Sequence, residues 1–396
     1  MTGTSPGGAT GGEHARSPRT LLEHKIRERR QSLEEFADYA EQFARQHGEP
    51  GTLSVRHLKR LVAGHGAHGQ PLGRPRPATA RLLERIFDTT IDELLAPPHT
   101  AVRDQRDDER ELRRMLHAAA RIDSTTLALL RDQLNATRRL DRQLGAIIAH
   151  DEVLTKTRQV TQLLHHSLTP ATRSQLAALL SELHSLAGWQ ALDMGQMHIA
   201  WQHYEHGRIA VSDTEHPAYR AHTIAGQAFV LIDLGDTANA NTMLAATRER
   251  THRTTSRLIR SWLAAAHGEA LAADQQPEAS ERAFDEADAL LPNDTADADG
   301  PYVALDPIHL ARWRGHALAR TGNPEAIDVL TTALDHLDPT FTRAETALRV
   351  DLAQALAACD EPIEARKQVE QADTLASHIG STRQGRRIST LRHSLQ

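Results

Sequence analysis

The chain has 396 residues, enough for two or three domains, and its single cysteine, Cys359, excludes an intrachain disulfide and a cysteine-based metal site. Its formal net charge of -6 excludes a chain that is basic throughout. Ala and Leu supply most of the apolar periodicity, and runs of β-branched residues are scarce. We therefore expect an all-α protein.

Positive charge is concentrated near the N-terminus. Residues 14–96 contain 14 Lys and Arg against 11 Asp and Glu, whereas the rest of the chain contains 32 against 41. A basic module on an acidic body is typical of a DNA-binding domain attached to a domain with another role. The sequence has no cationic segment followed by an apolar leader and no run of about 20 apolar residues, so we expect a cytoplasmic protein.

The first predicted elements follow a polar N-terminal stretch. Residues 1–18 are rich in Gly, Ser, Thr and Pro, which predicts a disordered tail. Leu22 and Ile26 then lie four apart on a short helix. Ser32 is followed three residues later by Glu35, which predicts a capping box at the start of a second helix.

The stretch from Ser54 to Gly64 predicts a short helix with one apolar face and one cationic face, capped by Ser54 and ended by Gly64. At about 100° per residue, Arg56 and Arg60 point away from the apolar side. That side contains Val55, Leu58, Leu61 and Val62. An Arg fork can bridge the O6 and N7 atoms of guanine, so the helix is suited to reading the major groove. A solvated amphipathic helix is the alternative.

Residues 76–95 continue with a Pro-bearing turn, an apolar helix and the closing segment Asp-Glu-Leu-Leu. With the Ser-capped helix and the cationic helix, this order resembles the phage-repressor-like (Xre-type) helix-turn-helix family over about residues 19–96. We therefore predict a helix-turn-helix DNA-binding domain at 19–98. The resemblance and the helix polarity together predict these DNA-binding residues: Arg27, Ser32, Ser54, Arg56, His57, Lys59 and Arg60.

Two features depart from the family pattern. Leu33 stands where the family usually carries a Gln that contacts DNA. The segment from Glu41 to Thr52 is predicted to connect the two central helices, and it is longer than the tight turn of the family. These departures leave open an alternative, in which the helix-turn-helix fold does not read DNA and the protein is an interaction scaffold.

Residues 99–170 are charged and helix-prone, so we predict a helical linker. Its apolar residues recur at spacings near three and four: Leu112, Met115, Leu116, Leu127, Leu130, Leu134, Leu140, Leu144, Ile147 and Ile148. Such helices could carry a dimer seam or pack on the domain that follows, and the sequence favours neither.

Residues 171–396 contain a repeat. Small-residue turns between paired helices are predicted at Gly195, Gly235, Gln275, Gly322 and Asp360. Each turn is followed by a small or aliphatic residue on the second helix: Ala200, Ala240, Ser280, Ile327 and Ala365. Bulkier residues follow four positions later at Tyr204, Leu244, Phe284 and Val369.

This pattern resembles the tetratricopeptide repeat, whose first helix carries a Gly seven residues before the turn, as at Gly188, Gly268 and Gly315. The spacings here exceed the 34 residues of that family, so we expect lengthened helices or loops. Five pairs would stack into an α-solenoid with a concave surface. A plain helical bundle is the alternative.

In tetratricopeptide proteins, certain positions of each first helix face the concave surface. When the repeats of this chain are aligned on their predicted turns, the residues at those positions predict a ligand groove. It contains Trp189, Asp193, His222, Phe229, Trp262, Glu269, Arg312, His316 and Arg320. Its aromatics could cover apolar side chains of an extended peptide while Arg312 or Arg320 pairs a carboxylate. The alternative for Trp189 and Trp262 is packing between repeats.

Catalytic motifs are absent from the sequence. It has no Gly-x-x-x-x-Gly-Lys-Ser/Thr, His-Glu-x-x-His or Gly-x-Ser-x-Gly string, so we predict neither enzyme activity nor a cofactor. Among the 24 histidines, His203 and His206 share a helix face, but no carboxylate or Cys completes a metal site there.

The two resemblances together imply a transcriptional regulator similar to actinobacterial proteins of this architecture. We expect it to bind double-stranded DNA as a homodimer, because one small helix-turn-helix contacts one half-site. A peptide, small ligand or protein partner in the groove would change dimer geometry and hence DNA affinity. Nothing in the sequence identifies the operator or the effector.

Overall fold

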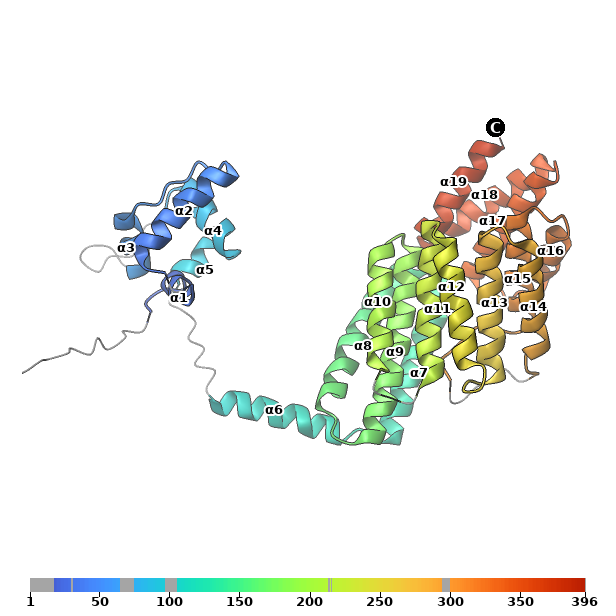
Figure 1. The fold of residues 1–396 in the computed structure, drawn as a ribbon, viewed down its shortest axis with the longest axis horizontal. Helices are drawn as coiled ribbons and strands as arrows, with labels where there is room; N and C mark the ends of the chain where they lie inside the picture. The colour runs from blue at the N-terminus through green and yellow to red at the C-terminus, as the bar shows by residue number, and fades with distance from the viewer. Residues whose placement is uncertain are drawn as a thin grey trace, which may run out of the picture. The chain divides into compact units, whose positions relative to one another are not determined.

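The computed structural model describes residues 18–29, 31–64, 75–96, 105–212, 214, 216–293 and 300–395. Every regular element in these residues is an α-helix, which confirms the all-α prediction. The chain divides into two compact units, Met1–Leu112 and Arg113–Gln396 (Figure 1). The predicted tail, the loop at 65–74 and the junction at 97–104 lie outside the described residues, apart from Pro18 at the end of the tail.

The first unit is built from five short helices around one apolar core. They are α1 (Leu21–Glu28), α2 (Leu33–His47), α3 (Val55–Ala63), α4 (Pro77–Phe87) and α5 (Ile91–Leu95). Phe36 of α2 lies at the centre of the core and stacks on Phe87 of α4, with ring centroids 5.3 Å apart. The backbone N–H of Leu21 donates to the carbonyl of Ala96 at 3.0 Å, so the two ends of the unit are joined.

Local sequence signals set the ends of these helices. Ser32 and Glu35 form the predicted capping box, and Ser54 Oγ accepts from the backbone N–H of His57 at 3.3 Å. Gly64 ends α3 with a φ of 70°. The prediction of a connection from Glu41 to Thr52 was wrong, because α2 continues to His47 and the connecting segment is only 48–54.

The second unit begins with helices that the sequence assigned to a linker. After α6 (Gln105–Ala120), which crosses the boundary between the units, α7 (Ser124–Leu144) and α8 (Ala146–His166) form an antiparallel pair. Leu127 and Leu134 of α7 are buried with Leu176 and Leu183 of α9. Of the two alternatives for these residues, packing on the repeat domain is therefore the one that the structure shows.

Five helix pairs follow α8. They are α9 (Pro170–Asp193) with α10 (Met197–Ala210), α11 (Pro217–Leu234) with α12 (Thr237–Thr251), α13 (Arg257–Ala273) with α14 (Pro277–Leu290), α15 (Pro307–Thr321) with α16 (Ala326–Asp335), and α17 (Thr342–Ala358) with α18 (Pro362–Ile379). A last helix, α19 (Thr382–Ser394), packs on α17 and α18. The helices of neighbouring pairs lie side by side in Figure 1, in a TPR-like stack.

All five predicted turns have left-handed backbone. The φ values are 77° at Gly195, 83° at Gly235, 58° at Gln275, 75° at Gly322 and 59° at Asp360. A residue in this conformation ends the first helix of a pair and lets the chain reverse into the second. The turn predictions are therefore confirmed.

Small residues allow the paired helices to approach closely. A Cβ on Gly188 would lie 3.0 Å from the Tyr204 ring, and one on Gly268 would lie 2.7 Å from the Phe284 ring. In the fourth pair, Ala326 is fully buried and Ile327 only partly, so the prediction of Ile327 as the small position was wrong by one residue. That pair has a slightly tighter turn.

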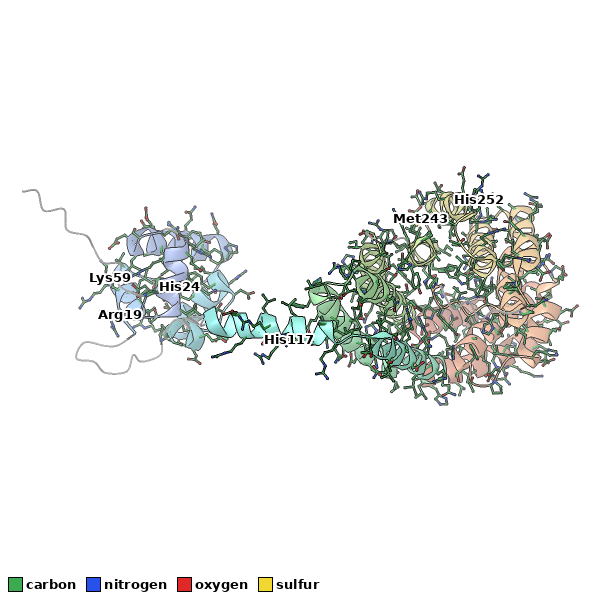
Figure 2. The ribbon with its side chains drawn as sticks, turned by 90° about the horizontal axis from the view of Figure 1, so that it is seen from below. Arg19, His24, Lys59, His117, Met243 and His252 are labelled. Carbon is green, nitrogen blue, oxygen red and sulfur yellow. The ribbon has the colours of Figure 1, made fainter. Side chains whose placement is uncertain are left out.

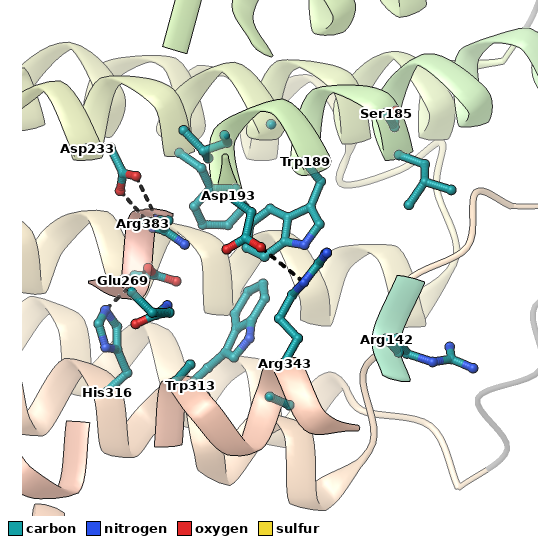
Figure 3. A pocket seen from close by; sticks show the side chains of 18 of the residues that line it. Arg142, Ser185, Trp189, Asp193, Asp233, Glu269, Trp313, His316, Arg343 and Arg383 are labelled. Atoms are coloured by element: carbon teal, nitrogen blue, oxygen red, sulfur yellow. Dashed lines mark hydrogen bonds and ion pairs between the residues drawn. The ribbon is translucent and has the colours of Figure 1, made fainter. Parts of the chain in front are cut away.

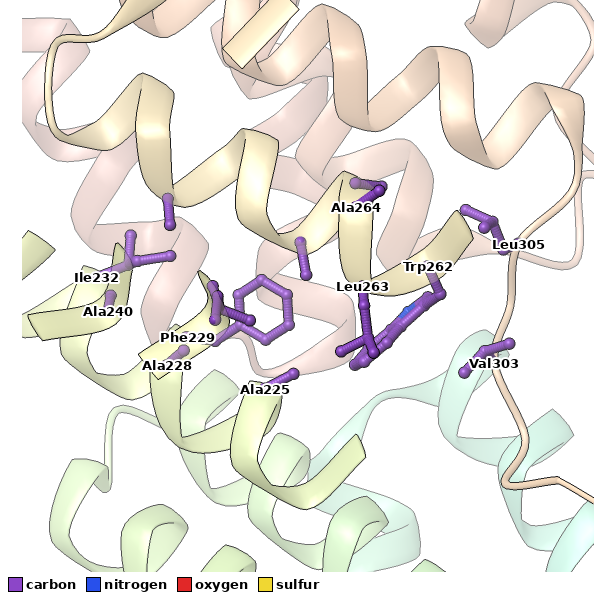
Figure 4. Packing of buried hydrophobic residues seen from close by; sticks show 14 of the residues in the cluster. Ala225, Ala228, Phe229, Ile232, Ala240, Trp262, Leu263, Ala264, Val303 and Leu305 are labelled. Atoms are coloured by element: carbon purple, nitrogen blue, oxygen red, sulfur yellow. The ribbon is translucent and has the colours of Figure 1, made fainter. Parts of the chain in front are cut away.

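The largest core cluster of the second unit runs through α9 to α15. Phe229 and Trp262 lie within it beside the small side chains of Ala225 and Ala228 (Figure 4). Large rings interdigitate with small residues here, which is how stacked helices reach close packing.

The last helices of the second unit return to its first ones. Helices α17 and α18 contact α7, and α19 contacts α9. Gly145, between α7 and α8, lies so close to α18 that a Cβ there would be 2.1 Å from the carbonyl oxygen of Ile379. The two ends of the stack therefore meet beside its concave side. None of the described helices is long and apolar enough to span a membrane.

Gly226→Ala should destabilise the second unit by about 1–3 kcal/mol. The new Cβ would lie 2.2 Å from Cε1 of Tyr204, whose side chain is only 3% exposed and has no room to move. All four tryptophans lie between residues 189 and 313, so urea unfolding followed by tryptophan fluorescence reports on this unit.

Gly385→Ala is the matched control, since nothing lies within 4 Å of its new Cβ. It should raise stability by about 0.5–1 kcal/mol, as expected for Ala replacing Gly in a helix. Equal unfolding midpoints for the two variants would contradict the packing described for Tyr204.

Candidate functional site

The outer face of α3 is cationic. Leu58, Leu61 and Val62 are buried, whereas Arg56, Lys59 and Arg60 are exposed. Val55, which the sequence placed on the apolar face, is only half-buried. Figure 2 shows Lys59 projecting from the surface of the first unit.

Arg56 and Arg60 have no hydrogen bond or ion pair with any side chain in the described part of the chain, so both guanidinium groups are available to a ligand. Lys59 and Arg27 differ. Lys59 Nζ lies 2.7 Å from Glu34 Oε1, and Arg27 Nη2 lies 2.5 Å from Glu23 Oε1.

His57 is half-buried beside this face. Burial lowers the pKa of His57, and the positive charges of Arg60 and Arg76 lower it further. His57 is therefore neutral near pH 7, and Arg76 adds a cation that the sequence analysis did not assign to the site. Ser32 and Ser54 cap helices, so the structure gives both hydroxyls a structural role.

A pocket of about 580 Å³ lies inside the second unit (Figure 3). All nine residues predicted for the groove line it, from Trp189 on α9 to Arg320 on α15. The structure thus brings the predicted set together, and its role in ligand binding stays a prediction.

Aromatic rings form one wall of the pocket. Phe229 lies 6.4 Å from Trp262 and 5.8 Å from Trp313 between ring centroids, and Trp189 lies 6.5 Å from Phe229. Trp262 is 6% exposed and belongs to the core, yet its ring also borders the pocket. Groove and core were alternatives for the tryptophans, and Trp262 serves both.

Ion pairs close the pocket where the C-terminal helices meet the first ones. Arg343 of α17 donates to both carboxylate oxygens of Asp141 on α7, at 2.8 and 2.9 Å. Its Nε lies 3.4 Å from Asp193, which also accepts from Ser381 Oγ at 2.6 Å. These side chains are almost completely buried.

Every carboxylate that lines the pocket has an arginine or a histidine as its partner. Arg383 binds Asp233 through two hydrogen bonds of 2.6 and 2.7 Å, and Arg138 pairs with Glu182. The remaining pairs are Asp141 and Asp193 with Arg343, Asp351 with His316 and Arg387, and Glu269 with His316.

Glu269 illustrates the balance of these effects. Burial by itself raises the pKa of a carboxyl group, but His316 and Arg320 hold the pKa of Glu269 at about 2. The same arrangement, with Arg387 and His316, holds the pKa of Asp351 well below its usual range. Both groups are therefore ionised at neutral pH.

Two arginines of α15 are left without such pairing. Arg312 has no ion pair with a described residue, and its buried Nε has no hydrogen-bond partner. Arg320 has a single long contact, 3.4 Å from Nη2 to His316 Nε2. Burial lowers the pKa of both guanidinium groups, and the charges of Asp351 and Glu269 offset only part of this.

Some residues that line the pocket were missed in the sequence analysis, although their distance in sequence from the predicted turns could have identified them. His222 and Trp262 lie thirteen residues before their turns, and the same place selects Glu182 and His309. Likewise, Asp233 lies two residues before its turn, as Asp193 and Arg320 do before theirs. These distances could not identify Asp141 or Arg383, because α7 and α19 lie outside the five pairs.

Histidines of α9 and α10 cluster between the two helices. His184 Nδ1 lies 3.1 Å from His203 Nδ1, and the ring of His206 lies 5.4 Å from that of His184. Burial lowers the pKa of His184 to about 3 and of His203 to about 4, with smaller effects from neighbouring histidines. The described residues include no group of three or more His, Cys, Asp or Glu that could hold a metal ion.

Comparison with known proteins adds little. No protein-family model matches the sequence, and no curated protein matches it. A crystal structure of a Podosopora anserina putative kinesin light chain with nearly identical TPR-like repeats is 18% identical. It covers 52% of this chain and 98% of its own, with a TM-score of 0.33, and a single-residue variant of that protein gives 0.34.

The TPR domain of P58(IPK) is 12% identical to this chain. The likeness covers 69% of this chain and 84% of that domain, with a TM-score of 0.26. Such scores are too low to carry an argument. The TPR-like description therefore rests on the helix pairs and their turns.

Arg343→Ala should destabilise the second unit by about 3–5 kcal/mol, because Asp141 and Asp193 would remain buried without their cation. Lys367→Ala is the control, on the neighbouring helix α18. Lys367 pairs with Glu364 at the surface, so its loss should cost about 0–1 kcal/mol. Urea unfolding followed by tryptophan fluorescence measures both. A small effect of Arg343→Ala would show that the pair does not hold the stack closed.

Acid should destabilise the second unit from pH 6.5 downward. Burial lowers the pKa of His222 to about 3 and of His267 to about 4, as at His184 and His203. The unfolded chain protonates these rings from pH 6.5, whereas the folded chain keeps them neutral. Above pH 6.5 these histidines do not lower the free energy of unfolding. As the pH drops from 6.5 towards the pKa that a histidine has in the folded state, each one lowers the free energy of unfolding by about 1.4 kcal/mol per pH unit.

Unfolding measured from pH about 7.5 to about 5 tests this. His222→Phe should flatten the pH dependence, whereas His378→Phe, at an exposed position of α18, should leave its slope unchanged. A stability that is constant over this range would contradict the assignment of neutral buried histidines.

Proposed function

We propose that this protein is a sequence-specific DNA-binding transcriptional regulator whose second unit senses a peptide, a small ligand or a protein partner. The polarity of α3 carries the proposal. Its apolar face is buried through Leu58 and Leu61, while Arg56 and Arg60 are exposed and have no partner among the described residues. A helix that is fixed by one face and presents two guanidinium forks on the other is suited to the major groove.

Two observations support the resemblance to the Xre-type helix-turn-helix. The connection between α2 and α3 is shorter than the sequence suggested, since it covers only 48–54. Arg76, just before α4, adds a cation close to His57. Leu33 still replaces the usual Gln, so the base contacts of this chain rest on Arg56 and Arg60.

The pocket of the second unit supports the sensor role. Its lining comes from helices of both ends of the unit, and its volume of about 580 Å³ lies within the range of small-molecule sites, about 300–1,000 Å³. A ligand that binds one curvature of the stack better than another shifts the protein towards that curvature. We propose that this shift changes DNA affinity, and that the protein acts in the cytoplasm by binding and not by catalysis.

We propose that the regulator works as a homodimer. Exposed apolar side chains gather at the turn between α7 and α8, where Leu144, Ile147 and Ile148 are 46%, 65% and 60% exposed. They belong to the seam suggested by the sequence, whereas Leu127 and Leu134 of that seam are buried inside the unit. A second copy of the chain would cover them.

An interaction scaffold is the second candidate. The ion pairs Lys59–Glu34 and Arg27–Glu23 favour it, because they occupy two cations that a DNA reader would place on phosphates and put carboxylates beside them. A TPR-like stack also fits this role. Binding to promoter DNA that weakens steeply with salt supports the regulator, and its absence supports the scaffold.

Arg56→Ala and Arg60→Ala should each weaken specific DNA binding by about 1–3 kcal/mol and relax the preference at one base pair. Genomic fragments captured by the full-length protein supply the DNA, and gel shifts measure affinity. Arg81→Ala, an exposed arginine of α4, is the control and should leave the footprint unchanged. Unchanged footprints for all three variants would show that α3 does not read bases.

A further inference from the structure

The pocket contains a cation whose partner is missing. Eight arginines and six carboxylates line it, and every carboxylate is already paired. Two of these arginines, Arg312 and Arg386, have neither an ion pair nor a side-chain hydrogen bond among the described residues; Arg386 is exposed, whereas the Nε of Arg312 is buried. Leaving a buried charged donor unsatisfied is costly, so such a group indicates a missing acceptor.

We propose that this pocket binds a small organic acid, with its single carboxylate on the guanidinium of Arg312 and an aromatic or branched apolar body against Phe229, Trp262 and Trp313. The inference rests on the proposed sensor role of the second unit and does not depend on DNA binding by the first. It names the chemical class of the ligand and the residue that selects it.

The charges of the wall favour one negative charge on the ligand. A planar guanidinium matches a carboxylate through two parallel N–H···O bonds. Glu269 and Asp351 stay ionised close to Arg312, as the causes of its lowered pKa show, and they would repel a second negative charge. Arg320 lies eight residues, about 12 Å, further along α15, and its guanidinium already contacts His316.

The rings beside Arg312 define the body of the ligand. Trp313 follows it directly in the chain, and the centroids of Trp313, Trp262 and Phe229 are 5.8 to 6.4 Å apart. His222 lies 4.8 Å from Trp262, and its lowered pKa keeps its ring neutral. This wall offers apolar contact and edge-to-face ring packing without a competing charge.

Closure of the stack sets the size of the ligand. An extended peptide needs a groove that continues beyond its ends, but here α17 and α18 contact α7 beside the pocket. The ion pair of Arg343 with Asp141 joins α17 to α7 there. The pocket therefore accommodates a compact acid more readily than a peptide in extended form.

The test uses three probes with one shape and three charges: 4-phenylbutyrate, its neutral amide and the cationic 4-phenylbutylamine. Each is titrated into the full-length protein, without DNA, by calorimetry and by quenching of tryptophan fluorescence. The acid should bind at least about tenfold more tightly than the amide, and the amine should not bind. An acid that binds no better than its amide, or that does not bind at about 1 mM, would overturn the proposal.

Arg312→Gln should weaken binding of the acid about tenfold and leave the amide unaffected. Arg314→Gln is the matched control, because Arg314 lies on the same helix and pairs with Asp285 away from the pocket. Arg312→Lys keeps the charge and should bind the acid with intermediate affinity, which covers the case in which Arg312→Gln does not fold. Equal losses for Arg312→Gln and Arg314→Gln would also overturn the assignment.

These results are distinguishable from a failure of the proposed function. Loss of ligand binding with intact gel shifts would overturn the inference alone. Gel shifts that are absent with or without acid, combined with Arg312-dependent binding of 4-phenylbutyrate, would overturn the DNA-binding proposal and leave the pocket assignment in place.

Discussion

The ion pair between Arg343 and Asp141 closes the second unit across 202 positions of sequence. It acts together with the contacts of α17 and α18 with α7 and with the hydrogen bond from Ser381 to Asp193. A buried pair contributes to stability only when its remaining donors and acceptors are satisfied. Gln190 meets part of this condition by donating to Asp141 at 2.8 Å, whereas Arg343 Nε lies 3.4 Å from Asp193 Oδ2 without a hydrogen bond.

The interior of the second unit is unusual in combining a large aromatic cluster with many ionised side chains. Each carboxylate is held by a guanidinium or an imidazole, and eight arginines face these six carboxylates, so the lining has more guanidinium groups than carboxylates before a ligand arrives. At Arg312 the burial of the guanidinium is not compensated by a partner. Ion pairing therefore accounts for the carboxylates of the pocket, and Arg312 is the buried cation for which we propose a ligand.

In the first unit, one face of α3 packs on the core and the opposite face presents arginines to the solvent. The core of the unit depends on residues such as Phe36 and Leu58, which are fully buried, while Arg56 and Arg60 on the other face of α3 are exposed. Arg56 and Arg60 can therefore be changed without loss of packing, which is the condition for a surface that evolves with its ligand. Lys59 and Arg27 are held in ion pairs and are less free to move.

The sequence by itself determined the turn at Gly235, the caps at Ser32 and Ser54 and the polarity of α3, because these depend on residues a few positions apart. It also indicated the nine pocket residues, since the repeat fixes which places face inward. Only the tertiary structure decided that α7 belongs to the repeat unit and that Asp141 meets Arg343. Such contacts depend on curvature accumulated over many stacked helices, and no local pattern encodes that sum.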